Sequence, residues 1–258
     1  MPSKNNRRTF LKSSLAAGGM LLASKSLFAA TDEDRFGENI KGENFTFLFQ
    51  GDSITDGNRT RNNDWNHVMG HGYQFIIASK LWYDFPEKKF HFFNRGISGN
   101  KVIDLEKRWD ADTIALKPDL LSILIGINDI NTSLGGGNNF TAESYEEKYR
   151  ALLQKTKADL PQVQLVLCEP FILPVGKVKD KWEAYDTEVK KYQVVVQKLA
   201  IEFNAIHIAF QQAFDKALKK APAEYWIWDG IHPMPAGHEM MAREWIKQVS
   251  KKIELIQK

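Results

Sequence analysis

Serine, aspartate and histidine residues stand in this sequence where they could act together. Ser53 follows Gly51 and Asp52 directly after an apolar run, and a serine in a tight turn between a strand and a helix exposes its hydroxyl group. Near the C-terminus, Asp229 and His232 are three residues apart on a predicted loop. The carboxylate could therefore orient the imidazole and stabilise the cation that forms when the histidine takes up a proton.

Two further motifs offer hydrogen-bond donors. Gly96 and Gly99 lie three residues apart after a second apolar run, and such glycines let a backbone N–H come close to a ligand. Asn128 follows a third apolar run, where its side-chain amide could donate to the oxyanion that develops during attack on a carbonyl. Each motif alone also fits an ordinary structural role, as a capping serine, a turn between a strand and a helix, or an Asx-turn.

Strand-like and helical stretches alternate along the chain and must position these motifs. The predicted strands are residues 44–50, 89–94, 119–125, 163–168 and 205–210. The predicted helices are residues 72–82, 102–116, 142–160, 185–203, 211–219 and 235–253. This alternation, without an internal repeat or a dividing linker, indicates one domain with a parallel sheet and helices on both faces. Ligands of such sheets bind outside the carboxyl ends of the strands, which is where the motifs stand.

Together and in this order, the motifs resemble the four signature blocks of the SGNH hydrolases, also called GDSL esterases and lipases. The blocks are Gly51-Asp52-Ser53, Asn94 to Gly99, Gly126-Ile127-Asn128-Asp129 and Asp229 to His232. The resemblance implies an α/β fold, a flavodoxin-like three-layer α/β/α sandwich whose parallel sheet has about five strands.

The same resemblance implies a role for each motif. Ser53 would be the nucleophile, His232 its general base and later general acid, and Asp229 the partner of the histidine. The oxyanion hole would be formed by the backbone amides of Ser53 and Gly99 and by the side chain of Asn128. The family works without a metal, and the resemblance implies no cofactor.

The first thirty residues differ in composition from the rest. Arg7-Arg8 precedes a moderately apolar stretch and then small residues, which resembles a twin-arginine export signal. Lys12 and Lys25 enclose only twelve residues, whereas a membrane-spanning helix needs about 20. We predict that residues 1–30 are a cleaved export signal and that residues 31–258 are the SGNH hydrolase domain, periplasmic or secreted. An uncleaved tether is the alternative.

The net charge changes when the predicted signal is set aside. The chain has 35 Lys and Arg against 32 Asp and Glu, a formal charge of +3. Residues 1–30 contain five of the basic residues and no acidic one, so residues 31–258 carry a net charge of −2. We therefore expect no nucleic-acid partner and no stable membrane insertion after cleavage of the signal. The expected binding partner is the substrate, a small-molecule or glycan ester.

Cysteine and histidine usage argues against other chemistries. Cys168 is the only cysteine of the sequence, which excludes an intramolecular disulfide and a multi-cysteine zinc site, and we predict a buried thiol. His67 and His71 are four residues apart and could share a metal ion on a helix, but nearby glycines disfavour a helix there. Residues 58–71 are predicted instead to form a loop that shapes the substrate pocket.

Other histidines and aromatic residues have structural interpretations. We predict that His238 is a surface or capping residue of the last helix, and that His91 and His207 pack within strands. Three tryptophans border the predicted site, where they could stack on sugar rings or be ordinary half-buried aromatics. They are Trp182, Trp226 and Trp228.

The sequence as a whole predicts an exported serine esterase that hydrolyses carboxylic esters through an acyl-enzyme intermediate. A carbohydrate O-acetyl esterase is the first interpretation, because export and polar, tryptophan-rich loops suit soluble glycans. A lysophospholipase or short-chain acyl esterase is the alternative within this class, although residues 131–140 are predicted to be a flexible polar insert rather than an apolar lid. A non-catalytic glycan-binding module on the same fold is the alternative from another class.

Overall fold

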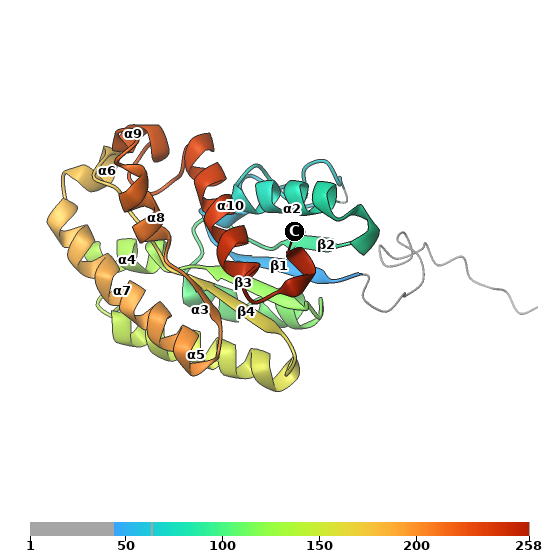
Figure 1. The fold of residues 1–258 in the computed structure, drawn as a ribbon. Helices are drawn as coiled ribbons and strands as arrows, with labels where there is room; N and C mark the ends of the chain where they lie inside the picture. Colours follow the sequence, from blue (N-terminus) through green and yellow to red (C-terminus); the bar gives the residue numbers. More distant parts are fainter. Residues whose placement is uncertain (1–43, 63, 258) are drawn as a thin grey trace, which may run out of the picture. The chain divides into compact units, whose positions relative to one another are not determined.

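The computed structural model describes residues 44–62 and 64–257, and it contains a five-stranded sheet in the order β2-β1-β3-β4-β5 (Figure 1). The strands are β1 (Thr46–Gly51), β2 (His91–Asn94), β3 (Leu120–Leu124), β4 (Gln164–Cys168) and β5 (Ile206–Ile208). All neighbouring pairs are parallel. The predicted parallel α/β fold is therefore confirmed. The predicted signal, residues 1–30, lies outside the described residues.

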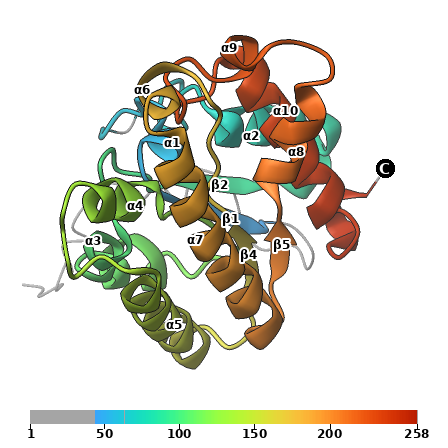
Figure 2. The ribbon, with the colours of Figure 1, turned by 90° about the vertical axis from the view of Figure 1, so that its left-hand side faces the viewer.

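Helices cover both faces of the sheet (Figure 2). One face carries α2 (Tyr73–Asp84), α8 (Phe210–Ala217) and α10 (Pro235–Val249), and the other carries α3 (Val102–Glu106), α5 (Ala142–Asp159) and α7 (Trp182–Glu202). Short helices complete the chain: α1 (Ser53–Asp56), α4 (Ile127–Leu134), α6 (Gly176–Lys179), α9 (Ala223–Trp226), η2 (Pro86–Lys88), η3 (Asp110–Ile114) and η4 (Glu254–Ile256).

The core explains why the central strands are apolar along their whole length. Every residue of β3 is buried, because helices pack on both sides of it. On β1, Phe49 packs against Tyr73 of α2 and Trp245 of α10, with ring centroids 6.0 and 5.5 Å apart. The Trp245 indole donates a hydrogen bond of 3.0 Å to Ser122 Oγ, so the polar side chain in the middle of β3 is satisfied.

The structure corrects two boundaries of the sequence analysis. The single helix predicted over residues 102–116 is split into α3 and the π-helical η3. The intervening segment places Trp109 in the core, where its indole donates to Thr156 Oγ1 at 2.9 Å. The insert predicted over residues 131–140 is partly helical, because α4 extends to Leu134.

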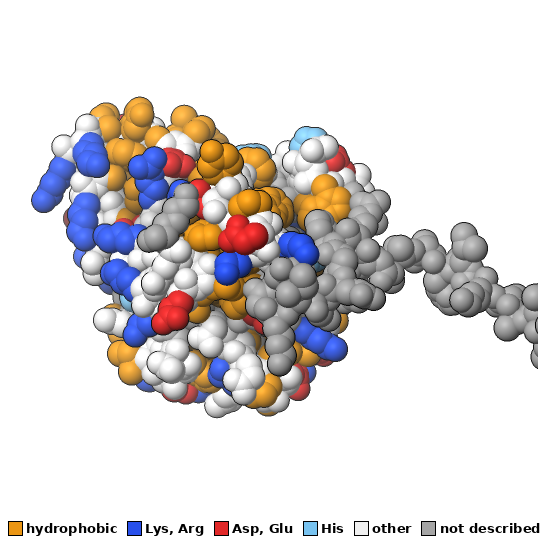
Figure 3. Space-filling model, turned by 45° about the vertical axis from the view of Figure 1, so that its right-hand side comes forward, with side chains coloured by type: hydrophobic (Ala, Val, Ile, Leu, Met, Phe, Trp, Pro, Cys, Tyr) orange, Lys and Arg blue, Asp and Glu red, His pale blue; other side chains and the backbone are white. Residues whose placement is uncertain are grey.

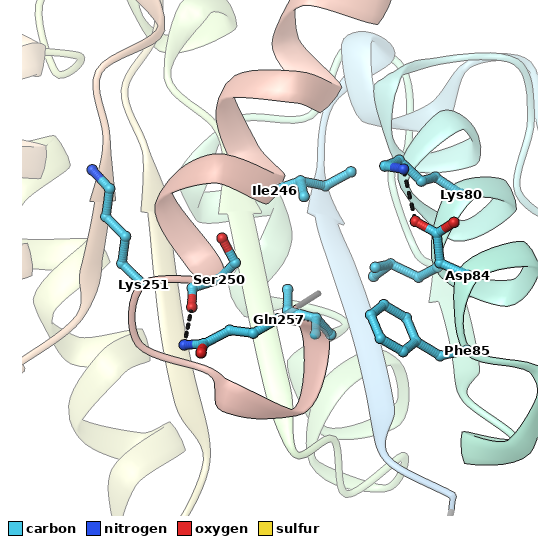
Figure 4. A pocket seen from close by; sticks show the side chains of 9 residues that line it. Lys80, Asp84, Phe85, Ile246, Ser250, Lys251 and Gln257 are labelled. Atoms are coloured by element: carbon cyan, nitrogen blue, oxygen red, sulfur yellow. Dashed lines mark hydrogen bonds and ion pairs between the residues drawn. The ribbon is translucent and has the colours of Figure 1, made fainter.

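Figures 3 and 4 show two further features of the surface. On the face drawn in Figure 3, Lys and Arg side chains gather along the left flank, so charge is spread unevenly. A pocket of about 420 Å³ opens between the last turns of α2 and α10, with Lys80, Phe85 and Ile246 among its lining residues (Figure 4). It includes none of the four sequence motifs.

Candidate active site

The turn that follows β1 places Ser53 at the first position of α1. Asp52 caps this helix, since its Oδ1 accepts a hydrogen bond of 3.0 Å from the amide of Ile54. A side chain at position 51 would bring its Cβ within 2.4 Å of the Leu124 carbonyl oxygen on β3. Glycine is therefore required where β1 ends, because the two strand ends approach too closely for any other residue.

Ser53, His232 and Asp229 form a continuous line of hydrogen bonds. The Ser53 hydroxyl lies 2.8 Å from His232 Nε2, and His232 Nδ1 lies 2.8 Å from Asp229 Oδ2. The aspartate is largely buried, whereas the histidine side chain keeps a third of its surface exposed. This arrangement allows the imidazole to accept a proton from the serine while the carboxylate holds the ring.

Hydrogen bonds to Asp229 keep it ionised. Burial raises the pKa of the carboxyl. Hydrogen bonds from the His232 amide, the His232 ring and the Ile231 amide outweigh this effect and lower the pKa from the ordinary value of 3.8 to about 2. The two amides donate to Oδ1 at 2.7 and 2.9 Å. Lys177 Nζ also approaches Oδ2, at 3.3 Å. The side chain that faces the imidazole is therefore an anion at neutral pH.

The loop that carries Asp229 and His232 is held by close backbone packing. The Trp228 amide donates to the His232 carbonyl at 3.2 Å, which closes the loop at its base. Gly230 has a φ of 94° and its carbonyl accepts from the Leu173 amide at 3.0 Å. A Cβ on Gly176 would lie 2.5 Å from Asp229 Cα, so glycine allows the start of α6 to pack on the aspartate.

Two of the candidate oxyanion donors, Gly99 and Asn128, lie on segments that contact each other, the loop after β2 and the first turn of α4. Asn128 stands in the first turn of α4, and its Nδ2 donates to the Asn100 carbonyl at 3.1 Å. Both carboxylate oxygens of Asp129 accept from the Val102 amide at 3.2 Å. These contacts fix the loop after β2, which contains Gly99, against the start of α4.

Gly99 has the backbone conformation expected of a close-approach glycine. Its φ is 82°, and a Cβ there would meet nothing within 4 Å, so conformation rather than space requires glycine. The neighbouring amide of Ser98 donates to Asp56 Oδ2 at 3.0 Å. Because Asp56 ends the helix that begins at Ser53, this bond ties the Gly99 loop to the serine turn.

Two buried carboxyl groups beside the site were not singled out in the sequence analysis as titrating groups. Burial raises the pKa of Asp52 to about 7 despite the hydrogen bond from the Ile54 amide. Burial likewise raises the pKa of Asp129 to about 7 despite the bond from the Val102 amide. Asp52 could have been recognised as a helix cap, since aspartate is favoured at that position. The burial of Asp129 has no signal in the local sequence.

The remaining histidines are placed as follows. His238 is buried, and its Nδ1 accepts a hydrogen bond of 3.1 Å from the Tyr73 amide at the start of α2. The expectation of a surface residue is therefore wrong, and its capping role is toward a neighbouring helix rather than its own. Burial is the main cause that lowers its pKa to about 4.

His67 Nδ1 lies 2.6 Å from Asp64 Oδ2, while His91 and His207 are partly exposed strand residues.

Cys168 and the tryptophans differ in exposure. Cys168 is fully buried at the end of β4, as predicted, and burial raises the pKa of its thiol to about 12. Trp182 is partly buried and Trp226 is buried. Trp228 is 62% exposed, and its ring centroid lies 6.3 Å from that of His232. Of the three tryptophans, Trp228 offers an open aromatic face beside the site.

Comparison with known proteins extends these observations. Residues 49–240 match the model of the GDSL-like lipase/acylhydrolase family. The chain belongs to this family. Family membership makes it a carboxylic ester hydrolase, and its parallel sheet is that of the SGNH hydrolases.

The relatives are similar over most of their length. An acetylxylan esterase from Geobacillus stearothermophilus is 34% identical over 215 residues, which are 81% of this chain and 95% of the relative. The crystal structure of that organism's acetylxylan esterase has a TM-score of 0.72 at 34% identity, covering 84% of this chain and 98% of the other. A GDSL-like lipase from Parabacteroides merdae has a TM-score of 0.77 at 43% identity, covering 81% and 97%.

Three further structures of the Geobacillus enzyme are of variants described as catalytic mutants. In these variants a serine, an aspartate or a histidine is replaced by alanine.

In this chain, no helix among residues 44–62 and 64–257 combines the length and the apolar character that crossing a bilayer requires.

Proposed function

We propose that this esterase is exported and removes O-acetyl groups from carbohydrates through an acyl-enzyme intermediate. The observation that carries the proposal is the line of hydrogen bonds from Ser53 through His232 to Asp229. The catalytic mutants of the related acetylxylan esterase, in which residues of the same three types are changed, support the same assignment.

In the first half of the reaction, His232 Nε2 accepts the Ser53 hydroxyl proton as the serine oxygen attacks the ester carbonyl. The tetrahedral oxyanion accepts hydrogen bonds from the amides of Ser53 and Gly99 and from the Asn128 side chain. As the carbon–oxygen bond to the sugar breaks, the protonated imidazole gives its proton to the departing sugar oxygen. Acetyl-Ser53 and the free sugar hydroxyl result.

In the second half, water replaces the sugar. His232 takes a proton from the water, whose oxygen attacks the acetyl carbonyl, and the same three donors stabilise the second oxyanion. Collapse of the intermediate returns the proton to Ser53 Oγ and releases acetate. Asp229 stays an anion throughout, in agreement with its pKa of about 2.

The carbohydrate assignment has two supports. The relative from Geobacillus is an acetylxylan esterase and matches most of this chain. Trp228, directly before Asp229, offers its exposed indole next to the His232 ring, where a sugar ring attached to the reacting ester could stack.

Export rests on the sequence of residues 1–30. The paired arginines Arg7 and Arg8 are its central feature. Fusion of residues 1–30 to a reporter that folds in the cytoplasm should carry the folded reporter across the membrane, and replacement of both arginines by lysine should retain it inside. Equal export of the two fusions would contradict a twin-arginine signal.

The decisive test of activity compares substrates and one variant. Release of acetate is measured from acetylated xylan and acetylated pectin, release of fatty acid from lysophospholipid, and release of nitrophenol from p-nitrophenyl acetate as a general ester. We expect the purified protein to release acetate from a glycan, and Ser53→Ala to lose activity on every ester. Ser144→Ala, which removes a serine hydroxyl from the capping box of α5 and touches none of Ser53, Asp229 and His232, serves as the matched control.

Each alternative predicts a different result. Preference for lysophospholipid over every acetylated glycan would favour the lipid or short-chain interpretation. Equally slow hydrolysis by the wild type and Ser53→Ala would contradict the serine mechanism and favour a glycan-binding module.

A further inference from the structure

A group of arginines lies beside the serine turn and is not used by the mechanism above. It consists of Arg59, Arg61, Arg95 and Arg108 with two carboxylates, Asp56 and Asp112, and is called here the arginine cluster. Four guanidinium groups thus face two carboxylates, although residues 31–258 as a whole carry a small negative charge. The cluster is a local excess of positive charge.

The carboxylates of the arginine cluster are already engaged. Arg61 donates to both oxygens of Asp56, at 3.1 and 2.6 Å. Arg108 donates to Asp112 Oδ2 at 2.9 Å, while Arg95 reaches the other oxygen only at 3.9 Å. Positive charge therefore remains on Arg95 and Arg59 after the two acidic side chains are paired.

Arg59 is the member best suited to receive a further anion. Its Nε donates to the Gly96 carbonyl at 3.0 Å and one Nη to the Thr60 carbonyl at 3.5 Å, and both acceptors are neutral. Among the described residues, no carboxylate lies within ion-pair distance of its guanidinium group, and Asp56 Oδ1 contacts Arg59 only at its backbone amide, at 3.2 Å. Burial, followed by the nearby charges of Arg61 and Arg95, lowers the pKa of Arg59 to about 10. The guanidinium stays charged at neutral pH, in a setting where an additional anion would relieve repulsion.

The arginine cluster is joined directly to the loops of the active site. Asp56 ends the helix that begins at Ser53 and accepts from the Ser98 amide, next to Gly99. Arg59 holds the Gly96 carbonyl on the same loop. A ligand group bound by Arg59 would therefore lie against the same loops that hold Gly99 and Ser53 in place.

We propose that Arg59, assisted by Arg95, is a subsite for a carboxylate of the substrate, and that the preferred substrates are acetylated glycans that also carry uronic acid residues. A guanidinium presents a planar fork of N–H donors that matches a carboxylate, and such charge-assisted pairs are stronger than neutral hydrogen bonds. The proposal rests on the proposed function and adds a substrate class to it.

The test compares two acetylated xylooligosaccharides of equal length, one with a glucuronic acid side residue and one without. We expect the wild type to have a kcat/KM about tenfold higher for the acidic oligosaccharide, as for one charge-assisted contact. This preference should fall as salt rises from about 50 to about 500 mM, because partly exposed charges are screened. Arg59→Gln should remove the preference, and Arg59→Lys should retain part of it.

The control is Arg150→Gln, which removes the same charge from α5, where Arg150 pairs with Glu146 and Glu202. It should keep the wild-type preference. Equal kcat/KM values for the two oligosaccharides in the wild type, or an equal loss on both in Arg59→Gln, would overturn the subsite. Absence of acetate release from both would instead overturn the proposed function. A further outcome is that the enzyme hydrolyses p-nitrophenyl hemisuccinate faster than p-nitrophenyl acetate and shows no preference between the two oligosaccharides. That result would place the bound carboxylate on the acyl side of the ester and overturn the glycan assignment.

Discussion

Lys177 Nζ lies 3.3 Å from Asp229 Oδ2, the same carboxylate oxygen that His232 Nδ1 contacts at 2.8 Å. The lysine therefore shares the charge of the aspartate with the imidazole. Because half of the lysine side chain is exposed, its influence should be modest and dependent on salt.

Removal of this cation should change the pH profile of the esterase. In Lys177→Gln the full charge of Asp229 stabilises the protonated imidazole, so the neutral imidazole that takes the Ser53 proton forms only at higher pH. We expect the acid limb of the kcat/KM profile to move up by a few tenths of a pH unit at low salt. The shift should shrink at about 500 mM salt, where charges are screened within a few ångströms. Lys179→Gln, on the same short helix, is the control, and an identical shift in both variants would contradict the specific contact.

Gly99 and Gly136 form a matched pair for testing the oxyanion hole. Both have a positive φ, 82° and 93°, and a Cβ at either would meet nothing within 4 Å. Alanine at each position should therefore cost a similar stability, about 1–2 kcal/mol, through backbone strain alone. We expect only Gly99→Ala to lose activity, by about tenfold or more, because its amide would turn away from the oxyanion. Thermal unfolding and p-nitrophenyl acetate turnover measure the two effects, and equal activity of both variants would argue against the Gly99 donor.

Asp52 should make the stability of the fold depend on pH. Its folded pKa of about 7 lies above the ordinary value of 3.8, so the folded state retains a proton between these values that the unfolded state has lost. Stability should fall as pH rises through this window. Asp52→Asn should remove the part of that fall that Asp52 contributes, so the stability of the variant relative to the wild type should grow with pH by up to about 4 kcal/mol.

Urea unfolding of the wild type and Asp52→Asn at several pH values between about 4 and 8 measures this difference. The direction should be the same for Asp129→Asn, because burial also raises the pKa of Asp129 to about 7. Parallel stability curves for the wild type and Asp52→Asn would show that Asp52 does not titrate in this range.

Cys168 should be inert in the folded protein. It has no exposed surface, and its thiol has a pKa of about 12, so little reactive thiolate is present. We expect a thiol reagent to leave esterase activity intact and to label the protein only in denaturant. Rapid labelling with loss of activity under native conditions would point to an accessible thiol.

The sequence predicts the central strands well because they are buried on both faces. The sequence of β3 is apolar at nearly every position, and in an α/β chain such a sequence predicts a strand that helices cover on both faces. The end of β5 is less well defined, because Phe210 suits a strand as well as a helix. In the structure it opens α8 and is fully buried. Helix boundaries near such residues depend on packing between distant segments.

The residues of the site divide in the same way, into those that a local motif predicts and those that only contacts between distant segments bring together. The sequence predicts Ser53, Asp229 and His232 as site residues because each lies in a short motif with a fixed spacing. The contacts of Lys177 with Asp229 and of Arg59 with Gly96 join positions 52 and 37 residues apart, and no periodicity signals them. His238 was misplaced on the surface because packing of α10 on α2, rather than its own sequence, buries it.

The hydrogen bond between Ser53 and His232 joins residues 179 positions apart. Four of the five strands and most of the helices form between them in the chain, and non-local contacts of this kind form late and slowly in folding. Catalytic activity is therefore a reporter of complete folding. During refolding from denaturant, esterase activity should return after the helical signal in circular dichroism, since helices can form locally before the two ends of the domain meet.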